Sequence, residues 1–531
     1  MTFTDSESKK TENEADGSAE TTPFFSSEFT STDNGHVEKS KGLSWVVTGL
    51  FLSGELAGAG VIALPLAVRN LGVYFGLMFL LVCAAMCIYT SMALGRSFLI
   101  LQKHWPVYRH HCRDPYAQLG YRSYGTWMKR LVEITLNFGS LPATVILIVI
   151  SANNLGDLIH HFAGYDLDYC YSAIIITLLV SPMSLLKSPQ DFWWALVIGM
   201  VCTMAAVTLA IFGISNDLTV CQDTFTTPSF QYTSAFASLG NVVLSYGGHA
   251  AFPTVQNDMK SPHKFTYSAA FAFSLITCLY FPISLAGNLA YNENLSSTVI
   301  RNIQMEWVQN AVNILITIHC CLTVVLIINP VMQTVEELLH APHKFGIHRI
   351  VIRFSMMALL LFIAETFPEF GPLMALAGGV FTSTTSFVFP AMFYLKLNVL
   401  DKKLNEKKTK KLMESAIEEK PSESVQIVVD EYKVGLMESL RRTQIIHLIP
   451  ILCVIVVGLF VMVMATAFAV MDIATVSFQV PCYLRWIDGI GKVNNFTKES
   501  PTVCCGQYSN ISLGTCTPLH PLNQYERINT E

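Results

Sequence analysis

The chain has 531 residues, of which 52% are apolar and only 14% are charged, and its formal net charge is −5. A soluble globular domain carries about 25% charged residues, so this composition argues against a soluble enzyme. The near-neutral charge, without a basic surface pattern, also argues against a protein that binds nucleic acid.

Charged residues are concentrated in two stretches of the sequence. Residues 1–43 and 396–442 hold 33 of the 73 charged residues, while long windows elsewhere hold one or none. Residues 1–43 are acidic, rich in Ser and Thr, and contain no apolar core of a cleavable signal peptide. We expect a disordered tail there and a polytopic membrane protein in the remainder of the chain.

Eleven apolar windows follow this tail, each with the length of a membrane span, about 17–25 residues. They lie at roughly 44–66, 73–95, 131–155, 170–186, 192–213, 234–254, 266–290, 308–332, 350–367, 371–395 and 443–470. The weakest is 350–367, because it carries Arg353 and Glu365 near its ends. The windows predict an all-α polytopic membrane protein with about eleven transmembrane helices.

Basic residues give these spans an orientation. With a cytoplasmic N-terminus, the inner segments hold 28 Lys and Arg and the outer segments hold 6, in agreement with the positive-inside rule. The expected organisation is a cytoplasmic tail at 1–43, a core of ten spans at 44–395, a charged cytoplasmic loop at 396–442, span 443–470 and an outer tail at 471–531.

Sequons and cysteines agree with this orientation. The glycosylation sequons at Asn294, Asn495 and Asn510 all fall outside. Six cysteines also fall on that oxidising side: Cys170, Cys221, Cys482, Cys504, Cys505 and Cys516. Six cysteines allow fifteen pairings, between which the sequence alone does not choose. The chain has no CxxC motif or Cys/His cluster with zinc spacing, so we expect no metal site.

Two spans are interrupted by small residues. The first reads SWVVTGLFLSGELAGAGVIALPLA, with Glu55 beside the Gly/Ala run, and the sixth reads SAFASLGNVVLSYGGHAAFP. Both interruptions lie roughly 17–18 Å into the membrane, near its midplane, when counted at the helical rise. They are approached from opposite faces and are five spans apart, which predicts an inverted five-plus-five repeat with one extra C-terminal helix.

Such breaks suit a ligand with both charges. The second half of a broken helix begins with free N–H groups, which favour a carboxylate. The first half ends with free carbonyls, which favour an ammonium group or a cation. A site that offers both points to a zwitterion such as an amino acid, although glycines could also serve close helix packing.

Glu55 and His249 are candidates for moving a proton. A carboxylate in the middle of a membrane is costly and usually faces a cavity or a partner. Burial disfavours its charged form, which would let Glu55 take up and release a proton. His249 could belong to the same relay, and hydrogen bonds to neighbouring helices are the structural alternative for both residues. His319, in span 308–332, is interpreted as packing.

Three segments resemble the amino acid/auxin permease family, nearest its proton-linked vesicular and vacuolar branch. They are GELAGAGVIALPLA (54–67), SYGGHAAFPTVQNDMKSPHKF (245–265) and FGPLMALAGGVFTSTTSFVFPAMFYL (370–395), and the resemblance covers roughly 44–470. It implies a fold like the inverted repeat of the leucine transporter. Glu55 departs from the small or amide residues expected at its position.

The resemblance also implies roles for particular residues. The backbone around Ala57, Gly58, Ala59 and Gly60 would receive the substrate carboxylate, and Glu55 adjoins it. Carbonyls near Ser245, Tyr246 and Gly247 would meet the amino group. Family members with a luminal disulfide pair a cysteine between spans 3 and 4 with one between spans 5 and 6. In this chain such a disulfide would join Cys170 to Cys221.

The leading expectation is therefore a secondary transporter of amino acids, coupled to protons, in a plasma or a vesicular or lysosomal membrane. One alternative couples it to sodium through span 1 carbonyls and hydroxyls such as Thr317 or Thr323. Another is a sensor that binds an amino acid without transporting it. An enzyme is least expected, because no nucleophile–base pair, metal motif or phosphate loop is present. No cofactor is expected beyond the coupling ion.

Overall fold

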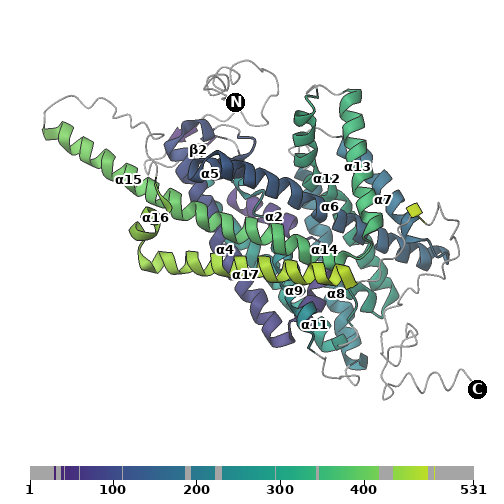
Figure 1. Cartoon of the computed structure of the whole chain (residues 1–531). Coiled ribbons are helices and arrows are strands. Elements are labelled where there is room, and N and C mark those ends of the chain that lie inside the picture. The colour runs from purple at the N-terminus through teal and green to yellow at the C-terminus, as the bar shows by residue number, and fades with distance from the viewer. Residues whose placement is uncertain are drawn as a thin grey trace, which may run out of the picture.

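The computed structural model of the chain is a bundle of helices (Figure 1). It describes residues 29–31, 37–40, 42–58, 60–109, 112–185, 193–221, 230–292, 295–341, 346–417, 434–475 and 483–484. Within these residues the only strands are β1 (Phe29–Ser31) and β2 (Val37–Lys39), which pair antiparallel. The expectation of an all-helical polytopic membrane protein is confirmed.

The first half of the bundle contains α2 (Trp45–Leu56), α3 (Gly60–Asn70), α4 (Val73–His104), η2 (Pro106–Arg109), α5 (Pro115–Tyr124), α6 (Thr126–Ala163), α7 (Tyr169–Ser184) and α8 (Trp193–Cys221). The second half contains α9 (Tyr232–Ser245), α10 (Phe252–Asn257), η5 (Pro262–Lys264), α11 (Phe265–Tyr291), η7 (Val299–Asn302), α12 (Glu306–Leu338) and α13 (Ile347–Thr366). The remainder is α14 (Phe370–Leu376), the π-helical turns η8 (Ala377–Thr382) and η9 (Thr384–Val388), α15 (Phe389–Ile417), α16 (Leu436–Arg442) and α17 (Ile445–Thr475).

Each of the eleven predicted windows coincides with one or more of these helices, but not all are uniform spans. Among the described residues, eight helices are long and apolar enough to cross a membrane, and the bent pair α2 and α3 makes a ninth. The predicted span 170–186 is α7, which has 16 residues and is shorter than a full span. The predicted span 234–254 is divided between α9 and α10, because the helix stops after Ser245. The weakest window, 350–367, forms the continuous helix α13.

Local sequence explains where several helices start and end. The hydroxyl of Ser44 accepts a hydrogen bond from the amide of Val47 and caps α2, and the carboxylate of Asp168 caps α7 through the amide of Cys170. Helix α6 ends at Ala163 and is followed by Gly164, whose left-handed φ of +62° favours glycine. These devices set the boundaries, while apolar side chains on the helices supply the packing.

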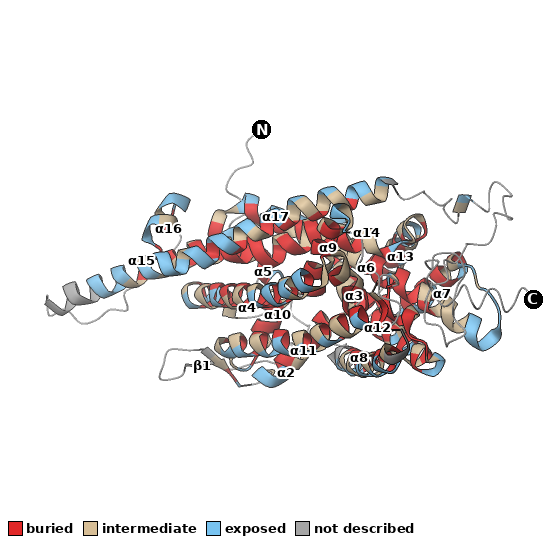
Figure 2. Ribbon diagram, turned by 90° about the horizontal axis from the view of Figure 1, so that it is seen from below, coloured by how far each residue is buried: buried red, intermediate tan, exposed pale blue. Residues whose placement is uncertain are grey.

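The buried centre of the bundle lies where α3, α6, α9, α12 and α14 converge (Figure 2). Close contacts there depend on glycine. A Cβ on Gly240 of α9 would lie 2.3 Å from the carbonyl oxygen of Ala375, and a Cβ on Gly378 would overlap the carbonyl of Gly240. Gly240 and Gly378 therefore serve close helix packing, because a Cβ at either position would meet backbone atoms of the neighbouring segment.

Residues 37–40, 42 and 43 lie against the segment that follows α10. The amide of Lys39 donates to the Lys260 carbonyl (2.9 Å), the amide of Leu43 donates to the Asp258 carbonyl (3.0 Å), and the amide of Lys260 donates back to Leu43 (2.9 Å). A Cβ on Gly42 would lie 2.5 Å from the Lys260 nitrogen, and its φ is +153°. This segment, part of the tail predicted to be disordered, ties the start of α2 to the end of α10.

The predicted loop at 396–442 is also partly helical. Helix α15 continues to Ile417 and projects beyond the body of the bundle beside α17 (Figure 1). Helix α16 packs on it through Glu438, which pairs with Lys403 of α15 (3.1 Å) and also with Arg442 of its own helix (3.2 Å). Residues 396–417 of the predicted loop therefore continue the last core helix.

Candidate functional site

The first broken helix consists of α2 and α3, whose axes differ in direction by 62°. The amide of Ala57 still donates to Ser53 (2.9 Å), but the amide of Gly58 turns back to the Leu56 carbonyl (2.8 Å). Helix α3 then starts at Gly60, and Ala59 lies outside the described residues. The interruption therefore falls within the Gly/Ala run that the sequence singled out.

The second broken helix consists of α9 and α10. Helix α9 ends at Ser245, the amides of Tyr246 and Gly247 make turn-like hydrogen bonds to Val243 (3.2 Å) and Leu244 (2.8 Å), and α10 begins at Phe252. The ring of Tyr246 is fully buried, and its hydroxyl lies 3.1 Å from Thr277 Oγ1 of α11. This interruption also falls at the predicted glycines.

The two breaks lie in contact with each other. A Cβ on Gly60 would lie 2.3 Å from Ser245 Oγ and 2.8 Å from Ser245 Cα, and a Cβ on Gly248 would lie 2.8 Å from Leu56 Cδ2. Between them stands the buried Tyr280 of α11. Its hydroxyl lies 2.9 Å from the Leu56 carbonyl and 3.0 Å from the Ser245 carbonyl. The last carbonyls of α2 and α9 therefore share one small region with the start of α3.

Glu55 and His249 are not joined by a hydrogen bond within the described part of the chain. Glu55 is partly buried at the end of α2, and its Oε2 is buried without a hydrogen-bond partner. His249 is fully buried against α4, with its Nε2 2.9 Å from Thr90 Oγ1 and 3.3 Å from the Cys87 carbonyl. Glu55 thus has an unsatisfied oxygen at the first break, while His249 is anchored to a neighbouring helix.

His319, interpreted from the sequence as a packing residue, lies near the first break. Its Nδ1 lies 3.0 Å from the Gly199 carbonyl, and its Nε2 lies 3.3 Å from Thr323 Oγ1. A Cβ on Gly58 would lie 3.9 Å from that Nε2. Since a carbonyl only accepts, Nδ1 carries the hydrogen, and in the neutral ring Nε2 is an acceptor at the wall of the break.

The hydroxyls proposed for sodium donate to their own helix. Thr323 donates to the His319 carbonyl (2.8 Å) and Thr317 donates to the Asn313 carbonyl (2.7 Å). Their oxygen lone pairs remain acceptors, so this geometry is compatible with either coupling ion. Among the described residues, no group of His, Cys, Asp and Glu is arranged to hold a metal ion.

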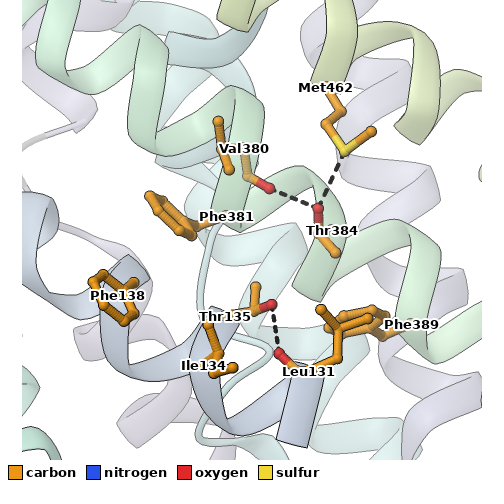
Figure 3. A pocket seen from close by; sticks show the side chains of 9 residues that line it. All are labelled: Leu131, Ile134, Thr135, Phe138, Val380, Phe381, Thr384, Phe389 and Met462. Carbon is orange, nitrogen blue, oxygen red and sulfur yellow. Dashed lines mark hydrogen bonds between the residues drawn. The ribbon is translucent and has the colours of Figure 1, made fainter. Parts of the chain in front are cut away.

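A separate cavity of about 540 Å³ opens between α6, the π-helical turns and α17 (Figure 3). Apolar side chains line most of it, and its two hydroxyls are already engaged. Thr135 donates to the Leu131 carbonyl (2.8 Å), and Thr384 donates to the Val380 carbonyl (2.6 Å) and lies 3.5 Å from Met462 Sδ. This lining suits apolar groups, so the cavity is a poor site for a zwitterion.

The predicted modifications are only partly within the described residues. Cys170 is buried at the start of α7 and is disulfide-bonded. The side chain of Cys221 lies outside the described residues, so its pairing with Cys170 stays a prediction. The sequons at Asn294, Asn495 and Asn510 lie outside them as well, as do Cys482, Cys504, Cys505 and Cys516.

Known protein sequences resemble this chain over most of its length. The family model described as transmembrane amino acid transporter protein matches residues 41–417. Amino acid transporter AVT1D of Arabidopsis thaliana is 24% identical over 352 residues, which cover 64% of this chain and 62% of that protein. Amino acid transporter AVT1I is 24% identical over 363 residues (64% and 83%), and lysine histidine transporter-like 1 is 22% identical over 379 residues (68% and 82%), both from the same plant.

Solved structures with a similar course of the chain have low sequence identity. MhsT in complex with L-phenylalanine has a TM-score of 0.47 at 13% identity, with 81% of this chain and 99% of that chain covered. Mhp1, in a closed conformation with bromovinylhydantoin bound, has a TM-score of 0.47 at 11% identity, with coverage of 84% and 96%.

Proposed function

This chain belongs to the family of transmembrane amino acid transporter proteins, and we propose that it moves amino acids across a membrane by alternating access. The observation that carries this proposal is the contact between the two broken helices. The last carbonyls of α2 and α9 and the start of α3 meet there within one region near the middle of both spans. An amino acid matches this arrangement because it carries both charges at close range.

In this proposal each end of the substrate has its own backbone partners. The carboxylate binds at the start of α3, around Ala57 to Gly60, where helix N–H groups and the positive end of the helix dipole favour an anion. The ammonium group binds the carbonyls at the ends of α2 and α9, with Tyr246 and Gly247 completing the second break. The contact of Gly60 with Ser245 supports this division, because it brings the two sets of groups within reach of one small molecule.

The proposed topology is an inverted five-plus-five repeat followed by α17. Residues 1–43 and 396–442 are cytoplasmic in this proposal, and 471–531 lie on the opposite side with the sequons. The excess of 28 inner over 6 outer basic residues supports it. The symmetric placement of the breaks, five spans apart in sequence, supports the repeat.

Proton coupling is assigned to Glu55. A buried carboxylate oxygen without a hydrogen-bond partner is costly in its charged form, so protonation stabilises the empty site. A substrate ammonium nearby would favour the charged form instead. Arrival of substrate thus changes the proton affinity of Glu55, which couples the two fluxes. His249, anchored to α4, acts as a secondary relay group in this proposal.

Uptake into proteoliposomes tests the proposal. The purified protein is given each of the proteinogenic L-amino acids in radiolabelled form, at fixed membrane potential, with the pH gradient and the sodium gradient varied separately. We expect uptake of a subset that follows the pH gradient. Uptake that depends on the sodium gradient alone would identify sodium as the coupling ion. Binding of an amino acid without counterflow would identify a sensor instead of a transporter.

A further inference from the structure

Tyr280 bridges the two breaks through its side-chain hydroxyl. It lies in the middle of α11, its side chain is fully buried, and its hydroxyl reaches the last carbonyl of α2 and the last carbonyl of α9, at 2.9 Å and 3.0 Å. These are the carbonyls of Leu56 and Ser245, which end the first halves of the two broken helices. No residue of α11 was singled out by the sequence.

A hydroxyl group has a property that the two carbonyls lack. It carries one hydrogen and two lone pairs, so it donates to one of the two carbonyls at a time and still accepts a hydrogen bond from a third group. The Leu56 carbonyl already accepts from the amide of Gly58 (2.8 Å), so when the hydroxyl donates to Ser245 each of the two carbonyls keeps one lone pair for a further donor. The hydroxyl and the two carbonyls therefore form a set of three acceptors in one place.

The position of this hydroxyl is held by contacts on both sides. The ring of Tyr280 packs edge-on against that of Tyr246, with centroids 5.4 Å apart. Helix α11 is also fastened along the first broken helix, because Ser268 Oγ donates to the Trp45 carbonyl (2.7 Å) and Asn288 Nδ2 donates to the Pro65 carbonyl (2.9 Å). The acceptor set is thus preorganised, which reduces the cost of binding a ligand there.

We propose that Tyr280 is a specificity-determining residue that, with the Leu56 and Ser245 carbonyls, recognises the three N–H groups of a primary ammonium. This inference rests on the proposed transport of amino acids and adds a restriction to it. A primary α-amino acid has three N–H donors for the three acceptors. An N-methyl amino acid has two, so one acceptor loses its partner.

The restriction has a measurable consequence in the Tyr280→Phe variant, which keeps the ring and removes the hydroxyl. A hydrogen bond to a charged group changes affinity by about tenfold or more, so we expect kcat/KM for a primary amino acid to fall by about tenfold. The N-methyl derivative, which already lacks one donor, should lose much less. The preference of the transporter for the primary amine should therefore decrease by about tenfold.

The test uses the L-amino acid that the wild-type protein takes up fastest, together with its N-methyl and N,N-dimethyl derivatives. Uptake of the first two is measured with wild type, Tyr280→Phe and Tyr291→Phe. The control removes a hydroxyl from the same helix, 11 residues after Tyr280, where it lies 2.5 Å from Asp217 Oδ2. We expect a reduced preference only in Tyr280→Phe, and a stepwise decline in wild-type uptake with each methyl group.

Three results would overturn the assignment. An unchanged preference for the primary amine in Tyr280→Phe, including an equal loss of uptake for both substrates, would make Tyr280 a structural residue. Equal uptake of all three amines by wild type would remove the need for three acceptors, even if the variant does not fold. If wild type takes up no amino acid, the proposed function itself is refuted and the role of Tyr280 with it.

Discussion

Replacing Gly60 by alanine should separate the two breaks. A methyl group on Gly60 would lie 2.3 Å from Ser245 Oγ, 2.6 Å from Ser245 Cβ and 2.8 Å from Ser245 Cα. Rotation of the serine side chain relieves the first contact only. Carbon atoms pack at about 3.5–4.0 Å, so α3 and α9 must move apart by about 1 Å. Overpacking of this kind costs about 1–3 kcal/mol.

The sign of this effect distinguishes it from simple helix propensity. Alanine within a helix is favoured over glycine by about 0.5–1 kcal/mol, so a site without tertiary contact would become more stable. We expect Gly60→Ala to lower the thermal unfolding midpoint in detergent and to reduce kcat/KM for uptake by about tenfold or more. The Ser245→Gly change should restore part of both, since it removes two of the three obstructing atoms.

Gly371→Ala is the matched control, because nothing lies within 4 Å of a Cβ at that position. It should leave uptake unchanged and, as a helix position without tertiary contact, raise stability by no more than about 0.5–1 kcal/mol. If Gly60→Ala behaved like Gly371→Ala in both assays, the two breaks would not be in contact, and the reasoning from their shared region would fail.

Three further results are expected. Glu55→Gln keeps the shape of the side chain without its titration, so uptake driven by a pH gradient should be lost while counterflow of substrate persists; a wild-type response to pH would make Glu55 a structural anchor. Peptide mapping without reducing agent should recover Cys170 joined to Cys221, and another partner for Cys170 would refute the pairing. Burial raises the pKa of the Cys112 thiol to about 11. At pH 8 iodoacetamide should therefore alkylate Cys112 about 100-fold more slowly than an exposed thiol, and the alkylation rate should rise about tenfold per pH unit up to pH 11. Fast labelling of Cys112 at pH 8 would contradict this.

The breaks were predictable because their cause is local. Runs of glycine and alanine within spans 44–66 and 234–254 interrupt helices at the positions where the structure ends α2 and α9. The length of each span was harder to predict, because it depends on where the folded helix stops. A window of apolar residues predicts a crossing, but it does not reveal that α7 has only 16 residues or that α9 stops after 14.

The partners of the breaks were not predictable, because they come from distant parts of the chain. Tyr280 is 224 residues from Leu56 and 35 residues from Ser245, and a tyrosine within an apolar window carries no sign of such a contact. His319 lies near the first break because α12 packs against α8, which in turn packs against α2, and its Gly199 partner is 120 residues away in the sequence. Pairing of Leu43 with residues 258–260 likewise requires the folded arrangement.

The central claim is that an amino acid binds between the two broken helices, and its position in an experimental structure tests this claim most directly. A map of the protein in lipid nanodiscs with its transported amino acid should show the carboxylate at the start of α3, and the ammonium group at the Leu56 and Ser245 carbonyls beside Tyr280. Density for the amino acid elsewhere, such as the apolar cavity between α6 and α17, with the two breaks still in direct contact, would contradict the account.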